Sequence, residues 1–195
     1  MRLSLICPTI GRSTLGRMIE SVLLQMHPGD ELLIVGDGPQ SNINPSELND
    51  WPGVRYVETD VKFGDFGCTP CDLGINIATG DAVFFIGDDD ECPPGAFDAI
   101  HKGFEANPTV PHVFSMMHTG VKLGGTVQCC AVSGQQIVVP RDMTKMPRMA
   151  ECPMGSLHIS DWIFIDKVHR AWNGQTIFHD EIIAILHNQN NGRMM

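Results

Sequence analysis

Four acidic residues in succession follow the strongest predicted strand of the sequence, at 81–86. They are Asp88, Asp89, Asp90 and Glu91, and two prolines follow at positions 93 and 94. Adjacent carboxylates repel one another, and a buried strand beside them raises that cost unless a cation neutralises the charge. Oxygen ligands favour hard divalent ions such as Mg²⁺ or Mn²⁺, and few protein ligands leave positions for phosphate oxygens. The run therefore predicts a metal and phosphate site, with a solvated turn before the prolines as the simpler alternative.

The position of this run depends on the elements that precede it. The pattern predicts strands at 3–7, 31–35, 55–57 and 81–86, and helices at 15–26 and 72–79. Thr14 or Ser13 is a candidate cap for the first helix. A strand, helix, strand order indicates parallel βαβ units, whose ligand sites lie beyond the carboxyl ends of the strands. Asp37 follows the second strand, so we expect it at the same sheet edge as the acidic run.

The second half of the chain has a different pattern. It predicts helices at 94–106 and 161–172, the second capped by Ser160, and strands at 112–117, 126–132, 135–139 and 181–186. Glycine-bearing turns join the middle strands, which is typical of antiparallel pairing. The expected fold is a single α/β domain with a mainly parallel, Rossmann-like sheet flanked by helices and a small antiparallel extension.

Composition limits the classes of function. The chain has 195 residues, enough for one domain with a substantial core. Its formal net charge of −10 disfavours a nonspecific nucleic-acid binder, whose phosphate-contacting face is normally basic. No segment approaches the ~20 apolar residues of a membrane-spanning helix, so we expect no membrane span and a cytoplasmic protein.

Two of the seven cysteines, Cys68 and Cys71, are spaced as in redox or zinc-binding pairs. A second pair at ligand spacing is missing from the sequence. We therefore interpret both as small buried side chains, with dithiol or zinc chemistry as the alternative.

Five short motifs in order give the chain a family resemblance. They are Pro8-Thr9, 35–39 (Val-Gly-Asp-Gly-Pro), 72–75 (Asp-Leu-Gly-Ile), 78–81 (Ala-Thr-Gly-Asp) and 86–90 (Ile-Gly-Asp-Asp-Asp). Their order and spacing resemble the family-2 glycosyltransferases of GT-A fold, well over about the first hundred residues and in outline beyond. The resemblance implies one GT-A domain over 1–195, with a nucleotide-binding half at 1–92 and an acceptor-binding half at 93–195.

The resemblance also implies a reaction. A sugar moves with inversion from a nucleotide-diphosphate donor, usually UDP-linked, to an acceptor hydroxyl, and Mn²⁺ or Mg²⁺ binds the Asp-x-Asp motif. The implied donor-binding residues are Pro8, Thr9, Asp37, Asp72, Asp88 and Asp89. Asp72 stands where the family usually has Asn after Arg, and Cys71 stands in place of that Arg, so base selectivity is open. The acceptor is unspecified, and the acidic composition disfavours nucleic acid without excluding it.

The metal ligands implied by the motif are Asp90, in direct contact, and Asp88, directed toward the donor. A late histidine completes the metal shell in some GT-A enzymes, and His187 fits that place, with His179 as the alternative. On an extended segment Asp89 points away from its neighbours and faces solvent or caps the next element. Glu91 is interpreted as a solvated neighbour of the prolines.

An inverting displacement requires a base on the acceptor hydroxyl. Asp161, at a predicted helix start, matches the position of the family's base, and Glu151 is the alternative. An acid in the first helical turn is also favoured by the helix dipole alone. Arg193 in the polar tail is a candidate partner of the diphosphate.

Two other functional classes stay open. A nucleotidyltransferase would need a glycine-rich basic loop after the first strand, and 8–13 offers one glycine and one arginine. A noncatalytic nucleotide-sugar binder would use the same donor site but would not depend on Asp161.

Overall fold

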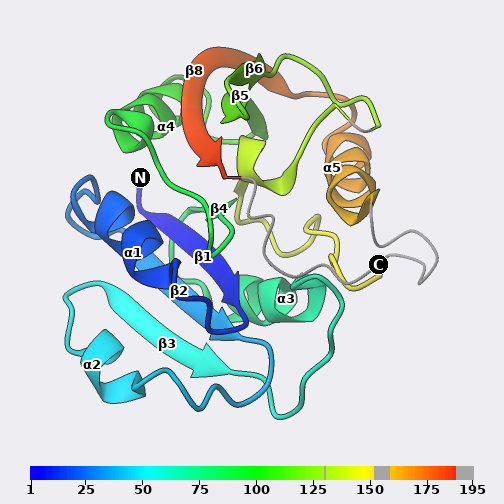
Figure 1. The fold of residues 1–195 in the computed structure, drawn as a ribbon. Coiled ribbons are helices and arrows are strands. Elements are labelled where there is room, and N and C mark those ends of the chain that lie inside the picture. Colours follow the sequence, from blue (N-terminus) through cyan, green and yellow to red (C-terminus); the bar gives the residue numbers. More distant parts are fainter. Residues whose placement is uncertain (130, 152–158, 188–195) are drawn as a thin grey trace.

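The computed structural model describes residues 1–129, 131–151 and 159–187. Its central element is an eight-stranded sheet in the order β3-β2-β1-β4-β7-β5-β6, with β8 paired to β5 (Figure 1). The strands of the first half are β1 (Leu3–Thr9), β2 (Glu31–Gly36), β3 (Val54–Glu58) and β4 (Ala82–Phe85). All three pairings among them are parallel, which confirms the predicted parallel half.

Alternating apolar side chains divide the core into two layers. Leu5 of β1 packs in one cluster with helices α1 (Leu15–Leu23) and α4 (Ala96–Ala106). Its neighbour Ile6 packs in the other cluster with α3 (Cys68–Ile77) and α5 (Ser160–Ala171). Successive strand residues point to opposite faces, so this alternation means that the helices cover both faces of the sheet.

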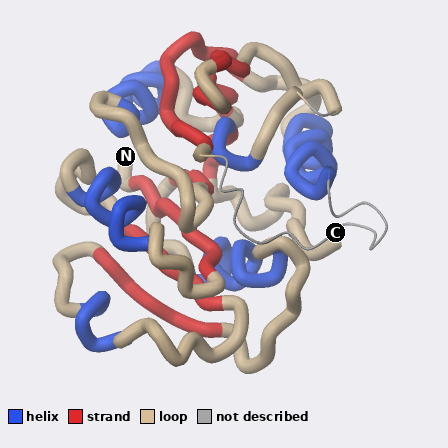
Figure 2. The backbone as a smooth tube through the Cα atoms, viewed as in Figure 1, coloured by secondary structure: helices blue, strands red, loops and turns tan. Residues whose placement is uncertain are grey.

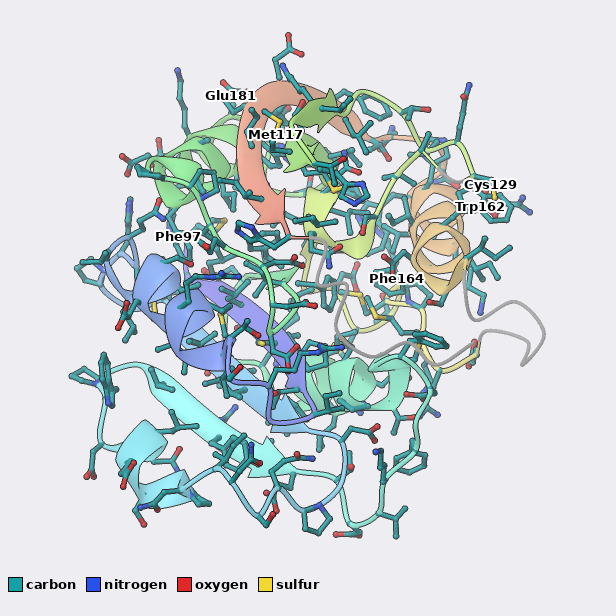
Figure 3. All side chains as sticks on the ribbon, viewed as in Figure 1. Phe97, Met117, Cys129, Trp162, Phe164 and Glu181 are labelled. Carbon is teal, nitrogen blue, oxygen red and sulfur yellow. The ribbon has the colours of Figure 1, made fainter. Side chains whose placement is uncertain are left out.

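The two layers can be followed in the figures. In Figure 1, α1 and α4 lie on one side of the sheet and α3 and α5 on the other. Figure 3 labels one large side chain from each layer, Phe97 of α4 and Phe164 of α5, both almost fully buried. Burying a phenylalanine stabilises the folded state by about 1.5–3 kcal/mol, so each layer holds its helices to the sheet by apolar packing.

The second half extends the sheet from β4. Its strands are β5 (His112–His118), β6 (Val121–Leu123), β7 (Ile137–Pro140) and β8 (Ile177–Leu186). β7 pairs antiparallel with both β4 and β5, which agrees with the antiparallel pairing expected in this half, and the unpredicted strand β6 pairs antiparallel with β5. β8 differs, because it runs parallel to β5 with register shifts.

Several predicted boundaries were wrong. The predicted strand at 126–132 is absent from the described residues of that range, which lies between β6 and the 3-10 turn η1 (Gly134–Gln136). Helix α3 begins at Cys68 rather than at position 72, so both cysteines of the spaced pair lie in its first turn. Ser160 is the first residue of α5 rather than its cap, and Thr14 makes no capping hydrogen bond at α1.

Two further features complete the fold. A short helix, α2 (Pro45–Asn49), was not predicted; it begins at Pro45, and the side chain of Asn44 caps it. The connection from β3 to α3, drawn as a long tan loop in Figure 2, supplies residues to the site described below. No helix within the described ranges has both the length and the apolar character needed to cross a bilayer.

Candidate functional site

The carboxyl ends of β1, β2 and β4 open into a cavity of about 660 Å³. Its wall contains five of the predicted donor-site residues, namely Pro8, Thr9, Asp37, Asp88 and Asp89, together with the predicted base Asp161. The wall also contains Arg12, Lys62, Cys68, Cys71 and Gln135. The cavity thus lies where parallel sheets bind their ligands, beyond the strand ends.

Asp88 is fully engaged by the loop that follows β1. Its Oδ2 accepts hydrogen bonds from Thr9 Oγ1 at 2.6 Å and from the Ile10 backbone N–H at 3.3 Å. Its Oδ1 accepts a hydrogen bond from Arg12 Nη1 and forms an ion pair with it. Only 1% of the Asp88 side chain is exposed. Both oxygens of this carboxylate therefore have protein donors, and the role of Asp88 as a metal ligand stays a prediction.

Arg12 places a positive charge beside the first part of the acidic run. Burial lowers the pKa of its guanidinium, but the Asp88 carboxylate outweighs that effect, so the pKa lies above its ordinary value. Arg12 Nη1 also lies 3.8 Å from Asp89 Oδ2, and the Asp89 side chain is 25% exposed on the cavity wall. Asp89 thus faces the cavity rather than bulk solvent.

Asp90 lies behind the wall and is buried. Its Oδ2 accepts a hydrogen bond from Gln135 Nε2 at 3.1 Å, and its Oδ1 accepts one from the His187 backbone N–H at 3.3 Å. Burial, and next the neighbouring Asp89 charge, raise the pKa of Asp90 to about 6. A carboxylate held in this way gains from a nearby positive charge.

The side chain of His187 contacts the acidic run at Glu91. Its Nε2 lies 2.9 Å from Glu91 Oε1, and Arg17 Nε lies 2.7 Å from the same oxygen. The interpretation of Glu91 as a solvated neighbour of the prolines was wrong, because this pairing and a bridge to Ile185 of β8 hold it in the structure. His179 lies elsewhere, against His112 at 2.7 Å between ring nitrogens.

The fit of a metal ion can be tested at Gly87. Among the described residues, no group of three His, Cys, Asp or Glu side chains is arranged to hold a metal. Two carboxylate oxygens nevertheless converge over Gly87, where a Cβ atom would lie 2.7 Å from Asp90 Oδ2 and 3.0 Å from Asp89 Oδ1. Mg²⁺ is commonly bound by one or two carboxylates plus substrate phosphates, so this oxygen pair fits a hard divalent ion.

Two acids predicted to bind the donor instead hold backbone segments through hydrogen bonds. Asp37 accepts hydrogen bonds from the backbone N–H groups of Phe63 at 2.7 Å and Gly64 at 2.9 Å. It thereby fixes the loop between β3 and α3 along the cavity.

Asp72 is the second of these acids. It accepts hydrogen bonds from the backbone N–H groups of Met149 at 2.7 Å and Ala150 at 3.0 Å, and Arg148 lies 3.5 Å away. Burial raises the pKa of Asp72, against the lowering effect of these donors. It is buried outside the cavity wall formed by the described residues, so its side chain joins the two halves of the chain rather than facing a donor.

Asp161 lies on the wall contributed by α5. Its Oδ2 accepts hydrogen bonds from Ser133 Oγ at 2.9 Å and from the Gly134 backbone N–H at 3.0 Å. Within the described part of the chain, its Oδ1 makes no hydrogen bond. Glu151 instead lies 3.3 Å from Lys167 Nζ, is mostly exposed and is not on the cavity wall. The structure therefore brings Asp161 to the site and leaves Glu151 outside it.

The two spaced cysteines form part of the cavity wall. Burial, and next the neighbouring Cys68, raise the pKa of Cys71 well above that of an ordinary thiol. A raised pKa disfavours the thiolate, the form needed for exchange or metal binding. This environment agrees with the interpretation as small buried side chains. Arg193, the predicted partner of the diphosphate, lies outside the described residues.

Sequence reasoning missed two residues of the site, Arg12 and Gln135. Arg12 was counted only as part of an insufficiently basic loop, although its place after the first strand at the sheet edge was a usable signal. Gln135 had no such signal, because its contact with Asp90 spans 45 positions and lies in a turn predicted as strand.

Comparison with known proteins places this site in a family. The sequence profile described as glycosyl transferase family 2 matches residues 4–127, which is more than half of the chain. The chain belongs to glycosyl transferase family 2. A search of curated proteins gave no match.

Solved structures agree on the fold. TarS of S. aureus (residues 1–349) superposes with a TM-score of 0.73 at 13% identity, over 95% of this chain and 60% of that one. A longer TarS structure gives 0.74 at 13% identity, over 95% and 36%. TarS 1–349 in complex with UDP-GlcNAc gives 0.73 at 12% identity, over 98% and 60%. This family-2 chain thus spans 60% or less of the TarS chains, and at this identity the likeness shows a shared GT-A fold.

Proposed function

We propose that the chain transfers a sugar, with inversion, from a nucleotide-diphosphate donor to an acceptor hydroxyl. This proposal rests on one observation. Acidic residues that follow β4 line the same cavity as Asp161 of α5. Membership of glycosyl transferase family 2 and the similarity to TarS bound to UDP-GlcNAc support a UDP-sugar as donor.

Asp89 and Asp90 would hold a Mn²⁺ or Mg²⁺ ion through the oxygens that converge over Gly87. A bound divalent ion stabilises the negative charge that develops on a departing diphosphate. This proposed pair differs in one member from the predicted pair of Asp88 and Asp90, because Asp88 is engaged by Thr9 and Arg12.

Asp161 is the proposed general base. Its Oδ2 is fixed by Ser133 and Gly134, which orients the carboxylate and leaves Oδ1 to accept a proton from the acceptor hydroxyl. A fixed orientation matters because general-base catalysis requires hydrogen-bond reach to the proton that is removed.

The test compares Asp161→Asn with the wild type. Asn keeps the shape and one acceptor oxygen but cannot take a proton, so UDP-sugar turnover should fall about 10²–10⁴-fold while UDP affinity stays within about twofold. UDP release in the presence of Mn²⁺ measures turnover, and calorimetry measures UDP affinity.

Asp166→Asn is the matched control. Asp166 lies on the same helix and pairs with the exposed Arg170 at 2.9 Å, away from the cavity wall, so its loss should leave turnover unchanged. Equal turnover by wild type and Asp161→Asn, with UDP still bound, would instead indicate a noncatalytic nucleotide-sugar binder. Binding of nucleoside triphosphate in place of UDP would favour a nucleotidyltransferase.

A further inference from the structure

The charge on the cavity wall is unusual for a diphosphate site. Among the described wall residues, four are acidic: Asp37, Asp88, Asp89 and Asp161. The basic side chains of the same wall are Arg12 and Lys62. A ligand that carries a diphosphate needs positive partners, so these two side chains are the protein's own candidates in addition to any metal ion.

Arg12 is the better placed of the two cations. It stands at the acidic run, on a loop fixed at several points. Gly11 adopts a φ of 75°, its N–H donates to Thr9 Oγ1 at 2.9 Å, and its carbonyl accepts from Asn42 Nδ2 at 2.5 Å. Lys62 is an exposed residue of the β3–α3 loop. A fixed backbone lowers the entropic cost of placing the arginine side chain.

The guanidinium of Arg12 is only partly used. Its Nη1 donates to Asp88 Oδ1, whereas Nε and Nη2 make no hydrogen bond within the part of the chain that the structure describes. A guanidinium carries five N–H donors in a planar fork, and this fork suits two phosphate oxygens at once. The Arg12 side chain is 45% exposed, so these donors are accessible from the cavity.

Asp88 has the properties of an anchor for this arginine. It is 1% exposed, and Thr9 and Ile10 donate to its other oxygen. A carboxylate held by the neighbouring loop fixes one edge of the guanidinium and directs the remaining donors.

We propose that Arg12 binds the diphosphate of the donor, and that Asp88 is a positioning residue that holds Arg12 rather than a ligand of the metal. This inference rests on the proposed function, since it requires a nucleotide-diphosphate donor in this cavity. It assigns the phosphate contact to a residue of the β1 loop and leaves the metal to Asp89 and Asp90.

The test measures the ratio of UDP affinity to uridine affinity by calorimetry, because that ratio isolates the diphosphate. Arg12→Gln should lower the ratio about tenfold or more, the effect of losing a charge-assisted hydrogen bond, and should leave uridine affinity unchanged. Arg12→Lys keeps the charge without the fork and should retain part of the ratio. It also supplies the comparison if Arg12→Gln is unstable.

Arg2→Gln is the matched control. Arg2 is a half-exposed arginine that lies 3.7 Å from Asp81, outside the cavity wall, so its removal changes the net charge equally. Its UDP-to-uridine ratio should equal that of the wild type. An unchanged ratio in Arg12→Gln, or an equal fall in Arg2→Gln, would overturn the role of Arg12. Failure of the wild type to bind UDP would contradict the proposed function itself.

A double-mutant cycle tests the positioning role of Asp88. Asp88→Asn should lower the UDP-to-uridine ratio in the wild-type background and have no further effect in the Arg12→Gln background. The cycle is repeated with and without Mn²⁺. If Asp88→Asn removes the Mn²⁺-dependent part of UDP binding equally in both backgrounds, Asp88 is a metal ligand and the positioning role is wrong.

Discussion

At the scale of single residues, the acids around the cavity divide into two groups. Asp37 and Asp72 each accept hydrogen bonds from two consecutive backbone N–H groups, and Asp161 accepts one such bond together with a hydroxyl. Asp89 and Asp90 instead lie side by side, and burial, and next the Asp89 charge, raise the pKa of Asp90. The first group holds loops in place, and an added cation would stabilise the second.

Replacement of Asp37 by Asn tests the anchoring role. Asn has one acceptor oxygen and turns an NH₂ group toward a backbone N–H, so one buried donor loses its partner. We expect the free energy of unfolding to fall by about 1–3 kcal/mol in urea titrations. Asp60→Asn, at an exposed position of the same loop, should change it by less than about 0.5 kcal/mol. Equal stability of the two variants would contradict the anchoring role.

At the scale of elements, β5 and β8 are joined by a stack of aromatic rings. The ring of His112 lies 5.0 Å from that of His179 and 4.3 Å from that of Phe104, and Phe114 lies 4.3 Å from His179. Burial lowers the pKa of both histidines, with smaller opposing effects from an Asn107 backbone bond and from Glu181. The fold therefore favours the neutral imidazoles.

This stack makes the stability of the chain depend on pH. Because the folded-state pKa values are lowered, the folded chain binds fewer protons than the unfolded chain, whose histidines titrate near 6.5. The stabilisation is fully present above that pH and is lost as the pH falls below it. We expect the urea midpoint to decrease from pH 7 to pH 5, and the decrease to shrink in His179→Phe, which keeps the ring stack. An identical decrease in both proteins would exclude the pair as its source.

The parallel half of the fold was predictable, because local patterns determine it. Buried runs such as 31–35 and 81–86 end in Gly-Asp turns, and that repetition indicated both the strands and the edge where the site lies. The second half was predicted less well. The described residues at 126–129 are half-exposed or exposed and form no strand, and the parallel pairing of β8 with β5 depends on contacts across more than sixty positions.

The partners of the site residues were beyond local patterns. The sequence identified Asp72, but its contact with Met149 spans 77 positions. The Arg12–Asp88 pair likewise spans 76 positions. A run of acids indicates that a cation is needed, and only the folded chain determines which carboxylate an internal arginine already neutralises.

At the scale of the whole molecule, the cavity joins the two halves of the chain. The first half contributes the loop after β1, the β3–α3 loop and the acidic run, and the second half contributes Gln135 and Asp161. Gln135 donates a hydrogen bond to Asp90, so one polar contact already joins the two halves beside the cavity, and Ser133 donates to both Gln135 and Asp161. A donor bound between these walls would contact both halves at once.

Hydrogen exchange measures this joint contact. With saturating UDP and Mn²⁺, we expect exchange to slow on the order of tenfold at 62–67 and at 133–136, since a ligand suppresses openings that break its site. Helix α2 lies outside the cavity wall and should be unchanged, and Mn²⁺ alone is the control for the metal. Protection confined to 62–67 would mean that the second half does not contact the nucleotide. In that case contact with the second half would require the sugar itself, and a UDP-sugar should extend the protection to 133–136.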